Sequence, residues 1–341
     1  MKNKKITIKD IAEALNITPS AVSKALNNHP RISDKTKDDV KRVANELNYQ
    51  PNNLATALRK GKSNLVGVMI PRTSSHFFSS VVEHIEEHLS KAGYNIIITQ
   101  SNESFARECK NIESLLFTQV DGIIASMANE TKSLEYFQKI KAKGIPLIMF
   151  DRGEEELNVD YIGIDDYQSS FLVVEHLKSQ GCKRIAHIGG HSHTRIYKNR
   201  IKGFRDALEK YGLPIDEELI SESSLSIEDG RRIMEQLLDL PDRPDAVYAA
   251  SDFAALGALQ VMHENNIEVP KEIALVGFSN ETFSSLVKPS ISTIEQHSDD
   301  IGKLASEAFL ERIEKPNFKK LQKKNIKLKP KLVVRSSSKR N

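Results

Sequence analysis

Residues 6–63 read ITIKDIAEALNITPSAVSKALNNHPRISDKTKDDVKRVANELNYQPNNLATALRKGKS, and this stretch predicts three short helices followed by a marginal fourth. Thr7 begins a T-x-x-D capping box in front of an apolar run with helical spacing. Thr18 is suited to cap the second helix, because Pro19 can take its first position without losing a hydrogen bond. Ser33 can cap a third helix with the same apolar spacing. The stretch therefore predicts a small all-α head.

The second predicted helix has a polar face that a folded three-helix domain does not require. Its apolar side consists of Val22, Ala25 and Leu26, and a short turn at Asn16 and Ile17 separates it from the first helix. Two helices joined in this way match a helix-turn-helix, whose second helix enters the major groove by its N-terminal residues. We expect base contacts from Pro19, Ser20 and Lys24, and phosphate contacts from Thr18, Ser23 and Asn27. An ordinary three-helix bundle with a solvated polar face remains the alternative.

The charge of the chain is concentrated at its two ends. Residues 1–62 contain 13 Lys or Arg and 6 Asp or Glu, a net charge of +7, which is typical of a head that binds double-stranded DNA. Residues 315–341 carry 11 basic residues and no acid, so the total of +3 leaves −15 for residues 63–314. An acidic body would be repelled by DNA, which confines binding to the head. The basic tail also contains apolar residues, so we expect strands packed on the body, with a DNA-binding arm as the alternative.

A short helix is expected between the head and the body. Pro51 ends the third helix, and Gly61 closes a segment of about one and a half turns, which is too short to be stable alone in water. Its two leucines have no local core to enter. We expect a hinge helix that folds on DNA and inserts into the minor groove, through Asn53, Leu54, Ala55 and Leu58. A plain linker with incidental leucines is the alternative.

From residue 64 onward, short apolar runs alternate with helical patterns. The clearest predicted strands are residues 65–70, 96–99, 122–125, 146–150, 185–189, 246–250 and 273–278. This alternation predicts parallel sheets that are covered by helices on both faces. In such sheets ligands bind outside the carboxyl ends of the strands, so the residues that follow each strand are candidate ligand contacts.

Polar and aromatic side chains follow several of these strands. Carboxylates, hydroxyl groups and arginine can pair with the hydroxyl groups of a sugar, and aromatic rings suit its apolar face. The candidate effector-binding residues are Ser75, Phe77, Phe78, Asp151, Arg152, Arg200, Ser251, Asp252 and Ser279. Capping of helices is an equally good explanation for Asp252 and Ser279.

Other classes of protein are not favoured by the sequence. The two cysteines form no C-x-x-C pair, and neither a glycine-rich nucleotide loop nor a nucleophile elbow occurs. His187, His191 and His193 lack an evident fourth metal ligand, so we expect no enzyme, no cofactor and no metal site. No apolar run has the roughly 18–20 residues of a membrane span, and the N-terminus is not a signal peptide. We therefore expect a cytoplasmic protein without membrane contacts.

Several longer motifs appear in order along the chain. They are LVGVMIPRTSSHFF, VDGIIAS, IPLIMFDR, KRIAHIGG, NRIKGFRDAL, ASDFAALGAL, VPKEIALVGF, PSISTIEQ and PKLVVRSS. Together with TIKDIAEALNITPSAVSKALNN and NNLATAL near the N-terminus, they resemble the lactose-repressor/galactose-repressor family of bacterial transcription regulators. The resemblance covers nearly the whole chain, and several motifs in a fixed order are far more specific than any one of them.

The resemblance implies a regulator, expected to be a repressor, that binds a pseudo-palindromic operator as a homodimer and responds to a small sugar-like effector. It implies a helix-turn-helix domain in residues 1–49, a hinge in residues 50–63, and a body in residues 64–341. The body would be α/β and similar to periplasmic binding proteins, with two parallel-sheet lobes. Matched motif by motif, it places base reading at Pro19, Ser20 and Lys24, the minor-groove leucine at Leu58, and effector contacts at Asp151 and Arg200.

The chain departs from the family at Ser279 in VGFSNE, where the family commonly has an acidic residue. The loss of that acceptor puts a standard contact with a neutral sugar in doubt. Arg72, Arg152, Arg195 and Arg200 can lie near one cleft, so a sugar acid or a sugar phosphate is an alternative effector. The alternative for the whole chain is a cytoplasmic sugar-binding protein or sugar-active enzyme whose basic head has an unrelated role.

Overall fold

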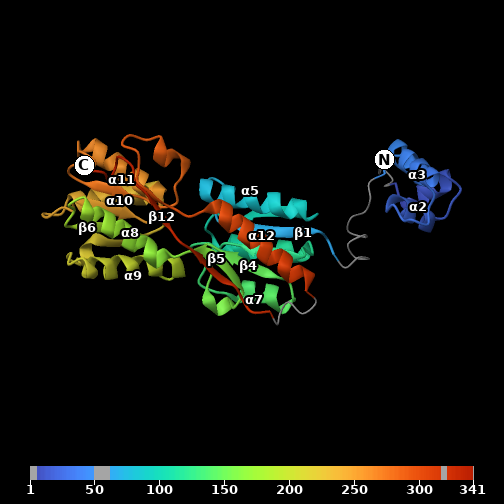
Figure 1. The fold of residues 1–341 in the computed structure, drawn as a ribbon, viewed down its shortest axis with the longest axis horizontal. Helices are drawn as coiled ribbons and strands as arrows, with labels where there is room; N and C mark the ends of the chain where they lie inside the picture. Colours follow the sequence, from blue (N-terminus) through green and yellow to red (C-terminus); the bar gives the residue numbers. More distant parts are fainter. Residues whose placement is uncertain (1–5, 50–61, 316–320, 341) are drawn as a thin grey trace. The chain divides into compact units, whose positions relative to one another are not determined.

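The computed structural model describes residues 6–49, 62–315 and 321–340 (Figure 1). The chain forms two compact units, Met1–Ser63 and Asn64–Asn341, which we call the head and the body and describe separately. The hinge candidates Asn53, Leu54, Ala55 and Leu58 lie outside the described residues. In the described ranges, no helix has the length and apolar character needed to cross a membrane.

Within residues 6–49 the head contains three helices, as the sequence predicts. They are α1 (Ile8–Ala14), α2 (Pro19–Leu26) and α3 (Asp34–Glu46). Thr7 forms the capping box of α1, Thr18 Oγ1 accepts the Ala21 N–H at 3.1 Å, and Ser33 Oγ accepts the Thr36 N–H at 3.3 Å. Asn16, at φ 51°, ends the first helix in the left-handed conformation that asparagine tolerates. The buried core joins all three helices through Ile11, Ala12, Val22, Ala25, Val40, Val43 and Ala44.

The first lobe of the body is built on a six-stranded sheet in the order β11-β5-β4-β3-β1-β2, in which every pair is parallel. The strands are β1 (Leu65–Ile70), β2 (Asn95–Gln100), β3 (Gly122–Ala125), β4 (Leu147–Phe150), β5 (Asp160–Ile164) and β11 (Asn325–Leu328). Val66 of β1 lies opposite Ile96 on one side and Gly122 on the other.

The second lobe contains a four-stranded parallel sheet in the order β7-β6-β8-β9 and a separate antiparallel pair. The strands of the sheet are β6 (Ile185–Gly190), β7 (Ile220–Ser223), β8 (Ala246–Ala249) and β9 (Ala274–Val276). The pair consists of β10 (Thr293–Glu295) and β12 (Lys331–Val333). The body thus has the two parallel-sheet lobes that the sequence predicts.

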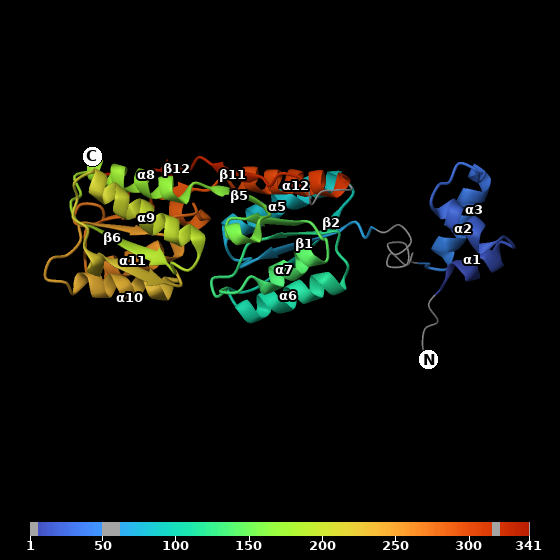
Figure 2. The same ribbon diagram turned by 90° about the horizontal axis from the view of Figure 1, so that it is seen from below.

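Helices cover both faces of each main sheet (Figure 2). In the first lobe, α5 (His76–Lys91) and α12 (Ser298–Glu314) pack together on one face, and α6 (Phe105–Phe117) and α7 (Glu135–Ala142) cover the other. In the second lobe the pairs are α8 (Asp166–Ser179) with α9 (Arg195–Lys210), and α10 (Ile227–Leu238) with α11 (Asp252–Glu264). Short 3-10 helices occur at Glu155–Leu157, Glu217–Leu219 and Thr282–Ser285.

The chain passes between the lobes three times: from β5 to α8, from β10 to α12, and from β11 to β12 (Figure 1). The third passage belongs to the basic tail. Its β11 extends the first sheet beside β5, and its β12 pairs with β10 in the second lobe. The expectation that the tail is strand packed on the body is therefore confirmed for these segments.

Two strands of the parallel sheets, β5 and β7, are not predicted by the sequence pattern. Strand β5 begins with an aspartate and contains Gly163, and strand β7 reads ISES, so neither forms a continuous apolar run. Both are specified by their neighbours: β5 lies between β4 and β11, and β7 pairs with β6. The other predicted strands lie within a few residues of their observed ends, because each is an apolar run, and all of these except β2 are mostly buried.

Candidate functional site

The outward face of α2 is the first candidate site. Thr18, Pro19, Ser20, Lys24 and Asn27 are exposed, Ser23 is half-buried, and Val22 and Ala25 on the opposite side are fully buried. The N-cap and the first turn of the helix therefore present polar groups to solvent, and Lys24 in the last turn adds one positive charge. This is the arrangement that a recognition helix requires, because its N-terminal residues must reach base edges while the apolar side holds the helix on the head.

Two of the proposed phosphate-contacting side chains already have local hydrogen bonds. The Thr18 hydroxyl caps α2, and Asn27 Nδ2 donates to the Ser23 carbonyl at 2.7 Å. A hydroxyl that accepts a backbone N–H can still donate its own proton. These contacts therefore fix the two side chains at the two ends of α2 and leave donors available there.

The second candidate site is a cleft between the lobes of the body, at the carboxyl ends of β1, β4, β8 and β9. The residues that line it are Arg72, Ser75, Phe77, Phe78, Glu103, Asn129, Asp151, Arg152, Ile196, Tyr197, Arg200, Ser224, Leu225, Ala250, Ser251, Phe253, Ser279, Glu281 and Gln296. Its free volume is about 60 Å³. That is smaller than the roughly 150 Å³ cavity that takes up benzene, so a sugar-sized ligand needs the cleft to widen.

The structure brings eight of the nine predicted effector-binding residues to this cleft, and the exception is Asp252. Asp252 is fully buried at the start of α11, where its carboxylate accepts the Glu281 N–H at 2.7 Å and the Thr293 hydroxyl at 2.8 Å. The side chain therefore connects α11 with the segment after β9 behind the cleft wall. Expecting it at the ligand surface was wrong, because its neighbour Ser251, and not Asp252, faces the cleft.

Arg195 also lies outside the cleft. Its backbone N–H donates to Glu154 at 3.0 Å, its guanidinium donates to Glu155 at 3.1 Å, and it stacks on the Tyr161 ring at 4.0 Å. These contacts join the start of α9 in the second lobe to the first lobe. The suggestion that four arginines share one cleft is therefore wrong for Arg195.

The arginines that do line the cleft are each paired with a carboxylate. Arg200 is 3% exposed and is paired with Asp166. Its Nε donates to Asp166 Oδ1 at 2.8 Å, and its Nη2 lies 2.8 Å from the same oxygen. Arg152 donates to Glu103 at 2.6 Å, and Arg72 lies 3.4 Å from the same carboxylate. Burial raises the pKa of Asp166 to about 6, although Arg200 opposes that rise.

Several cleft residues do not follow from the sequence pattern. Glu103, Asn129 and Glu281 follow β2, β3 and β9, but they stand three to five residues beyond the strand ends. A search that covered whole loops after each strand would have included them. Asp151 could be predicted because it follows β4 directly. In the structure, burial raises the pKa of its carboxyl group.

Among the residues that the structure describes, two buried polar atoms in the cleft wall have no hydrogen-bond partner. They are Asn129 Oδ1 and Arg152 Nε, on side chains that are buried in the first lobe. Most buried polar groups in proteins are hydrogen-bonded. One unpaired acceptor and one unpaired donor in the same cleft therefore mark positions where a polar ligand gains contacts.

His187 is a core residue, as its position in a strand suggests. It is 1% exposed and stacks on Phe204 and Tyr248. Its Nδ1 is 3.0 Å from the Tyr248 carbonyl oxygen, and burial lowers its pKa to about 4. The imidazole therefore stays neutral inside the second lobe.

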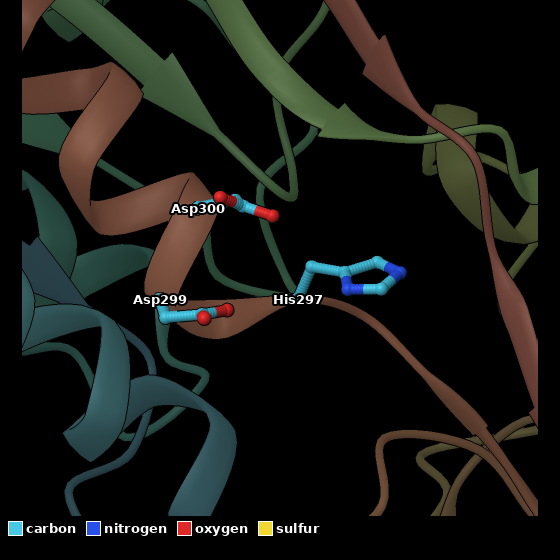
Figure 3. Close-up of side chains that lie close together, drawn as sticks. All are labelled: His297, Asp299 and Asp300. Carbon is cyan, nitrogen blue, oxygen red and sulfur yellow. The ribbon is translucent and has the colours of Figure 1, made fainter.

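A different histidine belongs to a group of possible metal ligands that the sequence analysis did not consider. His297, Asp299 and Asp300 at the start of α12 offer ligand atoms that all lie within 4.8 Å of one another (Figure 3). Both aspartates are exposed, and His297 Nε2 is 3.1 Å from the Lys329 carbonyl oxygen. Aspartates in the first helical turn are favourable without any ion, so this group supports no metal assignment.

The buried carboxyl groups predict how the stability of the body depends on pH. Burial raises the pKa of Asp252 to about 8, of Glu108 to about 7 and of Asp166 to about 6. The folded chain then holds protons that the unfolded chain releases above about pH 4, so the free energy of unfolding falls as pH rises toward 8. His187 acts in the opposite sense below about pH 6.5. Because three carboxyl groups outweigh one histidine, we expect the free energy of unfolding to fall from about pH 5 to pH 8, measured by urea unfolding between pH 5 and pH 9.

Asp252→Asn serves as the control for this pH dependence. Asparagine imitates the protonated acid, so the variant should lose less stability than the parent between pH 7 and pH 8.5. The slope that one group contributes is at most about 1.4 kcal/mol per pH unit. A parent protein whose stability rises steadily from pH 6 to pH 8.5 would contradict this assignment.

Known proteins resemble the chain over its full length. Residues 7–52 match bacterial regulatory proteins of the lacI family, and residues 174–338 match the periplasmic binding protein-like domain. The HTH-type transcriptional regulator DegA of Bacillus subtilis is 34% identical over 335 residues, which cover 98% of each chain. The structure of the lac repressor dimer bound to operator and the anti-inducer ONPF aligns with a TM-score of 0.85 and 24% identity, over 98% of this chain and 99% of that one. The complex of the transcriptional regulator CelR with cellobiose aligns with a TM-score of 0.73 and 26% identity, over 97% and 99%.

Proposed function

This chain belongs to the lacI family of bacterial regulatory proteins and is a DNA-binding transcription regulator, and we propose that it reads its operator with the outward face of α2. The observation that carries this proposal is the exposed start of α2 on a head with a net charge of +7. In the proposed complex Pro19, Ser20 and Lys24 meet base edges, and Thr18, Ser23 and Asn27 meet phosphates. A lysine in the major groove suits the O6 and N7 acceptors of guanine.

We propose that the operator is pseudo-palindromic and that two copies of the chain bind it. One helix-turn-helix reads only a few base pairs, and two heads related by a two-fold axis read two half-sites. The lac repressor, which shares this fold, is a dimer in its complex with operator. The proposed division of the chain is a DNA-binding domain in residues 1–49, a hinge in residues 50–63 and an effector-binding body from residue 64. Because its target is genomic DNA, the proposed site of action is the cytoplasm.

We propose further that a small sugar-like effector binds in the cleft between the lobes and changes the affinity for DNA. The cleft combines paired arginines, hydroxyl groups and aromatic rings, which are the groups that hold sugars in other binding proteins. A related regulator of the same fold was solved with cellobiose. Three passages of the chain connect the two lobes. A ligand that changes the separation of the lobes would therefore move the first lobe, whose strand β1 begins at Leu65, directly after the linker to the head.

Lys24→Ala tests the proposed recognition face. We expect the variant to lose roughly 1–3 kcal/mol of binding free energy on the cognate operator, and to tolerate substitutions at one base pair of each half-site. The reason is that Lys24 is exposed on α2 and would supply a direct base contact. The measurement is a gel shift or fluorescence anisotropy titration on the operator and on single-base variants, at two salt concentrations.

Lys35→Ala is the matched control, because Lys35 is an exposed lysine at the start of α3 and outside the proposed recognition face. It should weaken binding to all sequences to a similar, small extent. If Lys24→Ala also weakens all sequences equally, Lys24 contacts phosphate and not a base. Binding that does not fall with salt would instead contradict DNA binding by a basic head.

A further inference from the structure

The cleft contains one carboxylate, that of Glu281, which no cation balances. Glu281 follows β9 in the second lobe and is 4% exposed. Its carboxylate accepts the Ser75 hydroxyl at 2.5 Å and the His76 backbone N–H at 2.7 Å, both at the start of α5 in the first lobe. Within residues 6–49, 62–315 and 321–340, no lysine, arginine or histidine side chain forms an ion pair with it. Both of its partners are neutral donors.

The arginines of the cleft cannot provide the missing positive charge, because their own carboxylates hold them. Arg200 is paired with Asp166, and Arg152 and Arg72 share Glu103. Asp151, 3.8 Å from Arg152 Nε, adds a fourth carboxylate to the group formed by Glu103, Asp166 and Glu281. Three carboxylates and three guanidinium groups therefore line the cleft, with Asp166 paired to Arg200 behind them, and the cleft has no surplus of positive charge for an acidic ligand.

Besides the buried donor Arg152 Nε, the cleft offers acceptors to a ligand at Glu281 and Asn129. A carboxylate has about four acceptor positions, and Glu281 uses two of them. Asn129 Oδ1 is a buried acceptor with no donor. A ligand that satisfies these atoms must bring N–H or O–H groups, and a positively charged donor is favoured beside Glu281.

Glu281 is held in position from both sides. Its backbone N–H donates to Asp252 Oδ2 at 2.7 Å, and its carbonyl oxygen accepts the Ser284 hydroxyl at 2.6 Å. The carboxylate is therefore fixed and desolvated before any ligand arrives. Charge-assisted hydrogen bonds are roughly twice as strong as neutral ones, so a cationic donor gains most at such a group.

We propose that the effector carries a protonated amino group that binds the Glu281 carboxylate, as in an amino sugar. This inference rests on the proposed function of the cleft as the effector site. It replaces the sugar acid or sugar phosphate that the arginines of the sequence suggested. It also explains the departure at Ser279, because the acidic residue of this loop stands two positions later, at Glu281.

Matched pairs of sugars test the proposal. The probes are glucosamine, galactosamine and mannosamine, each compared with its parent hexose, together with glucuronate and glucose 6-phosphate. Calorimetry on the full-length protein near pH 6.5 should show at least one amino sugar binding about tenfold or more tightly than its parent. Raising the pH until the amine is deprotonated should remove this preference.

The variant Glu281→Gln keeps the size but removes the charge: its one carbonyl oxygen can accept the His76 N–H, and its amide NH2 can donate to the Ser75 hydroxyl. In it, the preference for the amino sugar should fall to within about twofold. Glu209→Gln, which removes an exposed carboxylate from α9 in the same lobe, should keep the full preference.

The outcomes of these titrations distinguish failure of the amine preference from failure of the proposed effector site. If no amino sugar binds more tightly than its parent, or if the preference survives in Glu281→Gln, the proposal is wrong. If neutral or acidic sugars bind instead, the cleft remains the effector site and only its preference for an amine fails. If no sugar of any class binds, the proposed effector site fails as well.

Discussion

Arg200→Ala is expected to lower the free energy of unfolding of the body by about 3–5 kcal/mol, because it leaves the buried carboxylate of Asp166 without its cation. The guanidinium also donates to the Ala250 carbonyl at 3.1 Å and lies 3.4 Å from the centre of the Phe278 ring. The variant should lose effector binding, since Arg200 lines the cleft. Urea unfolding and calorimetry measure the two effects.

The pH profile identifies the cause of this loss. Asp166 already has a pKa raised to about 6, and without Arg200 that pKa should rise further. The variant then binds a proton on folding over a wider range, so its loss of stability should be greater at pH 8 than at pH 6. Asp166→Asn in the same background should recover part of the stability.

Lys202→Ala is the matched control for Arg200→Ala. Lys202 is on the same helix, but its ion pair with Asp206 is at the surface, where such pairs contribute about 0–1 kcal/mol. A loss in Arg200→Ala no larger than in this control would contradict the structural role of the buried pair. Normal effector affinity in Arg200→Ala would remove Arg200 from the binding site.

Arg312→Ala is expected to cost about 3 kcal/mol, for a similar reason in the first lobe. Arg312, near the end of α12, approaches Asp160 at the start of β5 through two hydrogen bonds of 2.5 and 2.6 Å, and both side chains are buried. It also donates to the carbonyl oxygens of Leu321 and Gln322. The variant should therefore release the basic tail from β5 as well as lower stability, which amide hydrogen exchange in β11 can detect.

Two further variants separate geometry from charge at this site. Arg312→Lys keeps the charge but cannot form the two parallel hydrogen bonds, so it should recover only a small part of the loss. Lys315→Ala, in an exposed pair with Glu311 one residue beyond the helix, should change stability by less than about 1 kcal/mol. If Arg312→Lys is as stable as the parent, the bidentate geometry is not the stabilising feature.

The sequence by itself determined the features that depend on neighbouring residues. The caps at Thr7, Thr18 and Ser33 and the spacing of the apolar residues define the three helices of the head, because helix signals act within one or two turns. The seven apolar runs of the body were sufficient to predict parallel strands, since buried strands need no partner to be visible in sequence. The position of Asp151 directly after β4, and of Ser75 and Ser279 in the loops after β1 and β9, was enough to predict that they lie at one cleft.

The tertiary structure decided which side chains of each loop reach the cleft. Asp151 at φ 55° and Ser279 at φ 103° have left-handed backbone conformations, and such turns set the direction of the next residues in a way that strand periodicity cannot predict. Glu281 follows the turn at Ser279 and enters the cleft, whereas Asp252 is held behind the cleft wall by the Glu281 N–H and the Thr293 hydroxyl. Arg195 lies outside the cleft because it contacts Glu154, Glu155 and Tyr161, which lie about 40 residues earlier in the chain.

The same distinction applies to the pairing of charges and strands. Strand β5 is neither apolar throughout nor locally marked, and it is held by β4, β11 and the Arg312–Asp160 pair from segments up to 160 residues away. Local sequence contains no record of such partners, because they depend on how the whole chain folds. The sequence alone therefore defined the head, the layered body and the sheet edge at which the proposed effector cleft lies, whereas the charge balance of the cleft and the anchoring of the tail required the packed structure.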